Sequence, residues 1–172
     1  KGVFLQGVNW TPVRPNFADV PEAEVRRRVA AYRDMGCNLL RVWGGAVLEK
    51  ESFYDACDQM GLLVWQEFPL SSSGLENCPP DDRRSIAELA AVARSYLERR
   101  RHHPCLALWC GGNELMDAGG RPVGRSHPLI RCLGEVVRKG DPGRRFLPTS
   151  ASGPRFSADA KEFGRGLHWD VH

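Results

Sequence analysis

The sequence has few lysines, no closely spaced cysteine pair and no long apolar run, and each absence narrows the class of protein. Lysine occurs only at positions 1, 50, 139 and 161, and a formal net charge of +3 does not point to a polyanionic partner. The six cysteines contain no CxxC pair, which argues against a cysteine-bound metal and a disulfide framework. No apolar run approaches the roughly 18 residues of a membrane span. Buried free thiols, no nucleic-acid partner and no membrane contact are therefore expected.

The most basic segment, 99–103, reads RRRHH and would suit contact with a nucleic acid. It falls at the end of an expected helix, however, where cations complement the helix dipole. We therefore expect a solvent-facing helix end here.

The chain of 172 residues is long enough for one domain with a sizeable core. It opens with Lys-Gly-Val-Phe, without an initiator methionine or a signal-like segment, and we interpret it as part of a longer protein. Its localisation is left open by these residues.

Apolar runs and helical periodicities alternate along the whole sequence. The expected strands are 4–10, 38–43, 62–67, 106–110, 145–150 and 167–172. Four helices are expected. The first begins at a capping box formed by Asp19 and Glu22, and the second runs through 53–60 and ends at Gly61. The third spans 81–101, and the fourth extends from a cap at Ser126 to Gly140. This order of strand and helix predicts a parallel sheet with helical crossovers.

Loop lengths then favour one parallel architecture. The connections from helix to strand are short, whereas the loops that leave the strands are long, at 11–19, 68–80, 115–125 and 151–166. A (β/α)8 TIM barrel carries its site on loops of this kind. A doubly wound sheet shares the rule, but no GxGxxG or other glycine-rich phosphate loop is present. Residues 1–172 are therefore predicted to form a single domain, an incomplete N-terminal portion of a barrel with about five to six βα units.

Polar and aromatic residues gather where the expected strands end. The segment 106–110 is apolar, and a glycine pair, Asn113 and Glu114 follow it directly. Two glycines allow a sharp turn and a close backbone approach, and a carboxyl group at this rim is suited to proton transfer. The other residues at strand ends are Asn9, Trp10, Arg41, Trp43, Trp65, Gln66, Glu67, Trp109, His168, Trp169, Asp170 and His172. All five tryptophans lie at or near these ends, and aromatic faces beside carboxylates and amides suit a sugar ring.

Four segments, GVNW, NLLRVWGG, FYDACDQMGLLVWQEF and HHPCLALWCGGNE, closely resemble the catalytic barrel of glycoside hydrolase family 2, particularly its β-mannosidase-like branch. The resemblance covers essentially the whole chain, down to DVH at its end. It implies a retaining exo-β-glycosidase that acts on a carbohydrate and needs no metal or other cofactor. Glu114 resembles the general acid/base of the family, and Asn113 resembles the residue that holds the sugar 2-hydroxyl.

The resemblance also suggests further substrate contacts. Trp43 and Glu67 resemble substrate-contacting positions, although β-mannosidases typically have Asp, in WQDF, where this sequence has Glu67. The position of Asn9, Trp10, Arg41, His168 and Trp169 at the expected strand ends, and not the resemblance, adds them to the expected substrate-binding set. The family places its nucleophile after the seventh strand, which this chain does not reach. The 172 residues alone are therefore expected to be inactive and to need the remainder of the parent chain.

Two other functions stay open from sequence alone. His168, Asp170 and His172 alternate, so on a strand they share one face and offer ligand types that a divalent cation accepts in a metal-dependent hydrolase. A non-catalytic carbohydrate-binding domain is the second alternative, although the complete Asn113-Glu114 pair argues against a decayed site.

Overall fold

The structure, a computed structural model, describes residues 2–71 and 77–152. Five strands form one parallel sheet: β1 Gly7–Trp10, β2 Leu39–Val42, β3 Leu63–Glu67, β4 Leu106–Cys110 and β5 Arg145–Leu147. The helical elements between them are the 3-10 turn η1 Phe17–Asp19 and the helices α1 Glu22–Asp34, α2 Glu51–Met60, α3 Arg83–Arg100 and α4 Pro128–Gly140.

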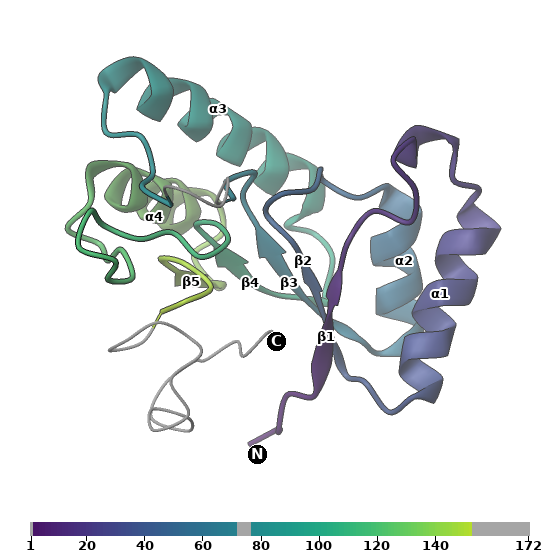
Figure 1. The fold of residues 1–172 in the computed structure, drawn as a ribbon. Coiled ribbons are helices and arrows are strands. Elements are labelled where there is room, and N and C mark those ends of the chain that lie inside the picture. The colour runs from purple at the N-terminus through teal and green to yellow at the C-terminus, as the bar shows by residue number, and fades with distance from the viewer. Residues whose placement is uncertain (1, 72–76, 153–172) are drawn as a thin grey trace.

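The strand order distinguishes a barrel from a doubly wound sheet. Neighbours in the sheet are neighbours in the sequence, from β1 through β5, and every pair is parallel. Because parallel crossovers are right-handed, a sheet that grows in one direction receives all of its helices on one face. Figure 1 shows the helices outside the strands, with α1 beside α2 and α3 beside α4. The predicted barrel architecture is confirmed, with five strands in the part of the chain that the structure describes.

The two faces of the sheet carry different side chains. On the helix-facing side, Leu40, Val42 and Val64 belong to the large core that includes residues of α1 to α4. On the inner side, Leu39, Trp65 and Leu108 pack with one another in a second, smaller cluster. This alternation follows from the two-residue period of a strand. Inward and outward positions along each strand can therefore be told apart.

Glycine and aspartate define several helix ends. Gly61 ends α2 in the left-handed conformation with φ 73°, as expected. Asp82 caps α3, which begins two residues later than the predicted 81, by accepting hydrogen bonds from the backbone N–H of Arg84 and Ser85 at 3.0 Å.

Two predicted helix caps are wrong. Asp19 lies in η1 rather than in a capping box, and Pro21 occupies the N-cap of α1. Ser126 does not cap α4, which begins at Pro128 after His127. The fixed φ of proline, about −65°, suits the first helical position, and its missing N–H costs nothing there, so Pro128 outweighed the serine signal.

The edge strands are shorter than predicted. The ladder of β1 begins at Gly7 rather than at Phe4, and Asn38 instead binds this segment through its side chain, accepting from Gln6 N and donating to Phe4 O, each at 2.8 Å. β5 ends at Leu147 because Pro148 has no N–H for a ladder hydrogen bond. The predicted strand 167–172 lies outside the described residues.

The cysteines are less uniformly buried than expected. Cys57, Cys105 and Cys110 are buried, and burial raises the pKa of each thiol. Cys37 and Cys132 are half-buried, whereas Cys78 is exposed.

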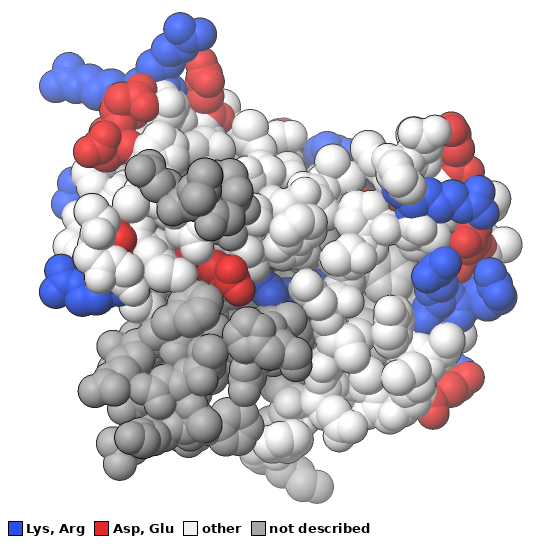
Figure 2. All heavy atoms as spheres, in the orientation of Figure 1, with Lys and Arg blue, Asp and Glu red and all other residues white. Residues whose placement is uncertain are grey.

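The surface mixes charges of both signs. Figure 2 shows Lys and Arg side chains next to Asp and Glu at the margins of one face, around a largely uncharged centre. None of the helices in 2–71 and 77–152 has the length and apolar character that a membrane crossing requires.

Candidate active site

The carboxyl ends of the strands bring distant residues to one edge of the sheet. The ladder pairs Asn9 with Arg41, and Arg41 with Trp65. Glu67, two residues beyond Trp65, ends β3 opposite Cys110 at the end of β4. Because the strands are parallel, the residues that follow β4 lie next to those that follow β3.

Arg41 and Glu67 form a buried ion pair at this edge. Arg41 donates from Nε to Glu67 Oε1 at 2.9 Å, and its Nη2 lies 2.8 Å from the same oxygen. The backbone N–H of Gly44 donates to Glu67 Oε2 at 2.7 Å. The side chains of Arg41 and Glu67 are 1% and 0% exposed. Both carboxylate oxygens are therefore held by donors of this chain.

Burial and charge act in opposite directions on Glu67. Burial raises the pKa of the Glu67 carboxyl, while the Arg41 guanidinium and the Gly44 N–H lower it, and burial is the larger effect. Cys110 lies beside this pair, and burial together with the Glu67 charge raises the pKa of its thiol. A buried carboxylate of this kind depends on its cation.

Arg41 also fixes the orientation of the Asn113 amide. Its Nη2 donates to Asn113 Oδ1 at 2.5 Å. A guanidinium offers only donors, so the amide oxygen has to face Arg41 and the amide nitrogen has to face away. Nδ2 of Asn113 donates to Ser71 Oγ at 3.3 Å. The ion pair thus presents the Asn113 NH2 group in a defined direction.

Glu114 adopts an unusual backbone conformation directly after Asn113. It is the one non-glycine residue in the described chain with a positive φ, at 51°, which is the left-handed region. Its N–H donates to Ser150 Oγ at 2.8 Å, and the next N–H, of Leu115, donates to Thr149 Oγ1 at 2.8 Å. Ser150 N in turn donates to Gly112 O at 3.0 Å. Two hydroxyls after β5 therefore hold the turn that carries Glu114, whose side chain is partly exposed.

The expected close backbone approach occurs at the glycine pair. A Cβ on Gly111 would lie 2.1 Å from the carbonyl oxygen of Pro148, so only glycine fits between β4 and the end of β5. Gly44 is similarly enclosed, since a Cβ there would lie 2.4 Å from Leu70 O. Gly44 thus allows the loop after β2 to approach the loop after β3, and Gly111 allows the chain after β4 to approach the chain after β5.

The tryptophans do not all share one face. Trp43 follows β2, is half-buried, and has its ring so close to Gly45 that a Cβ there would lie 2.2 Å from it. Trp65 lies on the inner face, with the Arg41 guanidinium 5.8 Å from its ring centroid. Trp65 therefore stands on the same side of the sheet as Glu67, two residues further along β3.

The expectation that the tryptophans surround one mouth is wrong for Trp10 and Trp109. Both point into the helix-facing core, because each occupies an outward position of its strand. Trp10 packs 4.6 Å from Phe53 and donates to Glu49 Oε1 at 2.9 Å. Trp109 stacks on Phe68 and donates from Nε1 to Asp141 at 2.9 Å. They serve packing, and we leave Trp10 out of the proposed pocket.

Asn9 stays in place as a pocket candidate. It stands next to Arg41 in the ladder, and its Oδ1 is buried with no hydrogen-bond partner within the described chain. The predicted contacts His168 and Trp169, and the alternative metal ligands His168, Asp170 and His172, lie outside the described residues.

The basic segment 99–103 was expected to be a solvent-facing helix end, but only part of it faces solvent. Arg100 and His103 are buried, at 4% and 2% exposure, and they contact acidic residues of α2. Their partners lie about 50 positions earlier, which a local pattern does not reveal. Groupings with metal-ligand spacing occur here, before β4, whereas the described strand-end site contains none.

Sequence reasoning also missed Thr149 and Ser150. They were placed at the end of the fifth strand without a role, although polar residues at the ends of the other strands had been selected. Their position at the end of a strand was the signal that could have identified them.

Comparison with known proteins agrees with this geometry. A family model described as glycosyl hydrolases family 2, TIM barrel domain, matches residues 3–149. The β-mannosidase of Capra hircus is 32% identical over 162 residues, which cover 86% of this chain and 18% of that protein. β-Mannosidase B of Aspergillus fumigatus is 33% identical over 188 residues, with 98% and 22% covered.

Solved structures show the same fold. The crystal structure of β-D-mannosidase from Dictyoglomus thermophilum has a TM-score of 0.78 at 30% identity, covering 88% of this chain and 19% of that one. A β-glucuronidase from Bacteroides uniformis, at 20% identity and a TM-score of 0.66, shares the fold. The chain spans about a fifth of the length of these relatives. By its match to the family model and its partial barrel, this chain belongs to glycosyl hydrolase family 2 and carries part of the family's TIM barrel domain.

Proposed function

We propose that the protein hydrolyses β-glycosides, with β-mannosides as the substrate class, by a retaining mechanism in which Glu114 is the general acid/base. The observation that carries the proposal is the position of Glu114, directly after Asn113 at the end of β4, in a left-handed turn held by Ser150. Membership of glycosyl hydrolase family 2 and relatives named β-mannosidases support the same activity.

Glu114 transfers one proton in each of the two steps of the mechanism. Its carboxyl group donates a proton to the glycosidic oxygen as the bond breaks, and its carboxylate then takes a proton from the water that releases the sugar. A second carboxylate has to act as nucleophile, and the family pattern places it beyond residue 172.

Asn113 and the ion pair contribute orientation. The Asn113 NH2 group, turned away from Arg41, donates to the sugar 2-hydroxyl. Glu67 is fully buried and has both oxygens engaged, so we assign it the positioning of Arg41 rather than a direct sugar contact. Trp43, at the end of β2, supplies an aromatic face for the ring.

The test compares two leaving groups in the intact protein. Glu114→Gln should lower the hydrolysis of substrates with poor leaving groups by a factor of about 10² or more, because these substrates need a proton on the departing oxygen. Activated aryl glycosides should lose less. In Glu114→Ala, azide should restore turnover and give a β-glycosyl azide, since azide needs no general base.

Glu88→Gln provides the matched control, because Glu88 is an exposed glutamate on α3. It should leave both rates unchanged. Equal losses on both substrate types in Glu114→Gln, with no azide product in Glu114→Ala, would assign Glu114 a structural role and overturn the proposal.

A further inference from the structure

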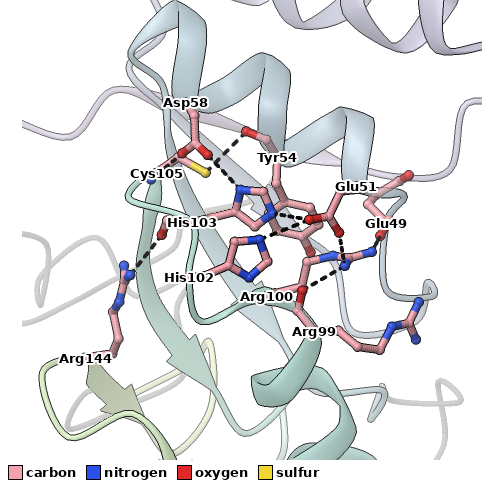
Figure 3. Close-up of polar contacts among 10 residues, drawn as sticks. All are labelled: Glu49, Glu51, Tyr54, Asp58, Arg99, Arg100, His102, His103, Cys105 and Arg144. Carbon is pink, nitrogen blue, oxygen red and sulfur yellow. Dashed lines mark hydrogen bonds and ion pairs between the residues drawn. The ribbon is translucent and has the colours of Figure 1, made fainter.

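Two segments far apart in sequence bring three ligand atoms together near the amino-terminal end of β4. Glu51 begins α2, and His102 and His103 follow α3. Glu51 Oε1 lies 3.1 Å from His102 Nε2 and 3.0 Å from His103 Nε2. Figure 3 shows both imidazole rings turned toward this carboxylate. Two imidazole nitrogens and a carboxylate oxygen thus converge on one point.

A second carboxylate orients His103 from behind. Asp58 Oδ2 lies 2.7 Å from His103 Nδ1, on the side of the ring away from Glu51. Asp58 is itself fixed, because its Oδ1 accepts from the backbone N–H of Cys105 at 2.7 Å. Metal-bound histidines in proteins characteristically carry such a carboxylate on the other ring nitrogen, which fixes the tautomer and raises the basicity of the ligand.

Glu51 is also preorganised. The buried Arg100 guanidinium holds Glu51 Oε2, which leaves Oε1 for the two histidines. Arg100 is anchored by the Glu49 carbonyl at 2.7 Å and by the Tyr54 ring at 4.9 Å. The carboxylate oxygen that faces the histidines therefore has a fixed position.

The distances and exposure suit a tetrahedral ion. With metal–ligand bonds of about 2.1 Å, ligand atoms stand roughly 3.4 Å apart, close to the 3.0 and 3.1 Å found here. The side chains of Glu51 and His102 are 50% and 60% exposed, so an ion can enter from solvent and keep a water as fourth ligand. Aspartate behind a histidine and an open fourth position are both features of zinc sites.

We propose that Glu51, His102 and His103 bind one divalent transition-metal ion of the zinc type. The ion takes the place of the protons that otherwise lie between Glu51 and the histidine nitrogens, and it ties α2 to the connection between α3 and β4. β4 separates this site from Glu114, which follows its carboxyl end, so the proposal does not depend on the proposed glycosidase activity.

The experiment is a zinc titration of the intact protein after treatment with a chelator. His102→Asn alters an exposed side chain, and Glu51→Gln keeps an amide oxygen as an acceptor for Arg100, which also donates to Glu49 O; both leave His103 in place, so folding should be preserved. His127→Asn is the matched control, since His127 precedes α4 and is not part of the group formed by Glu51, His102 and His103. Isothermal titration calorimetry should show one equivalent of zinc more in the parent protein and in His127→Asn than in His102→Asn and Glu51→Gln.

Cobalt and pH provide two further measurements. Co²⁺ in the parent protein should give the intense visible absorption of tetrahedral coordination, and His102→Asn should lose it. Binding should weaken on acidification, because protons compete for the histidine nitrogens. Equal zinc stoichiometry in all four proteins, or no zinc binding by the parent protein, would overturn the proposal and leave the three residues as an ion-pair network only.

Discussion

Replacing Arg41 by methionine tests whether the strand-end site depends on one buried ion pair. Methionine fills much of the same volume but removes the guanidinium that contacts Glu67 Oε1 and Asn113 Oδ1. Glu67 then keeps the Gly44 N–H and the weak Cys110 thiol donor but no cation, in a place without solvent access. Breaking one partner of a buried pair destabilises a protein by about 3–5 kcal/mol, because an uncompensated charge is left behind.

The effect should depend on pH with a defined sign. Burial already raises the pKa of Glu67 above 4.5, so the folded protein binds this proton more tightly than the unfolded chain does. The contribution of Glu67 to stability therefore falls as pH rises from about 4.5 through the raised pKa of the folded state. Without Arg41 that pKa rises further, so the loss in Arg41→Met should be greater at pH 7 than at pH 5.

Hydrogen–deuterium exchange of peptides covering β2 and β3 measures this change inside the barrel of the intact protein. A loss of 3–5 kcal/mol corresponds to a rise of about two to four powers of ten in the exchange rate, relative to the parent at the same pH. Arg84→Met is the control, because its pair with Glu88 is 89% and 65% exposed and contributes little.

A double variant separates the charge from the packing. Arg41→Met combined with Glu67→Gln removes the unpaired charge and should recover part of the lost protection. If Arg41→Met changes exchange no more than Arg84→Met, or equally at both pH values, the reasoning from a buried pair is refuted.

Three further predictions concern Ser150, Glu67 and Asp58. Ser150→Ala removes the acceptor for the Glu114 N–H and should lower kcat about threefold to tenfold with little change in KM. Ser150→Thr keeps the hydroxyl and should keep the rate. A change in KM alone would contradict this role of Ser150. Glu67→Asp should displace the Arg41 guanidinium and shift the ratio of mannoside to glucoside hydrolysis, and an unchanged ratio would remove Glu67 from specificity. Hydrogen bonds to Cys105 and His103 outweigh burial and hold the pKa of Asp58 below 3.8, so its contribution is present above that value and is lost as pH falls through the lowered pKa. Acid unfolding followed by circular dichroism should therefore begin at higher pH in Asp58→Asn than in the parent protein.

Local patterns in the sequence determined the elements and their order. The apolar segment 106–110, the stop at Gly61 and the long loops after the strands are short-range features, and they led to a parallel barrel that the structure confirms. The resemblance of motifs such as HHPCLALWCGGNE to the family pointed to Glu114 and Asn113 in the same way. Caps were less certain, because Pro21 and Pro128 competed with nearby serine and aspartate signals.

Which side of the sheet each residue faces was decided by tertiary structure. Position at a strand end does not distinguish inward from outward side chains, so Trp10 and Trp109 were grouped with Trp43 although they pack against the helices. A shift of one residue along a strand turns each side chain to the opposite face of the sheet, and only the register of the ladder fixes which face it takes.

Contacts between distant segments were also beyond a local reading. Ser150 reaches Glu114 across 36 positions, and His103 reaches Glu51 across 52. The sequence by itself determined a partial barrel with a carboxyl group at the end of its fourth strand. The tertiary structure decided how that group is held and which charges lie buried beside it, because those contacts exist only once parallel strands bring their ends together.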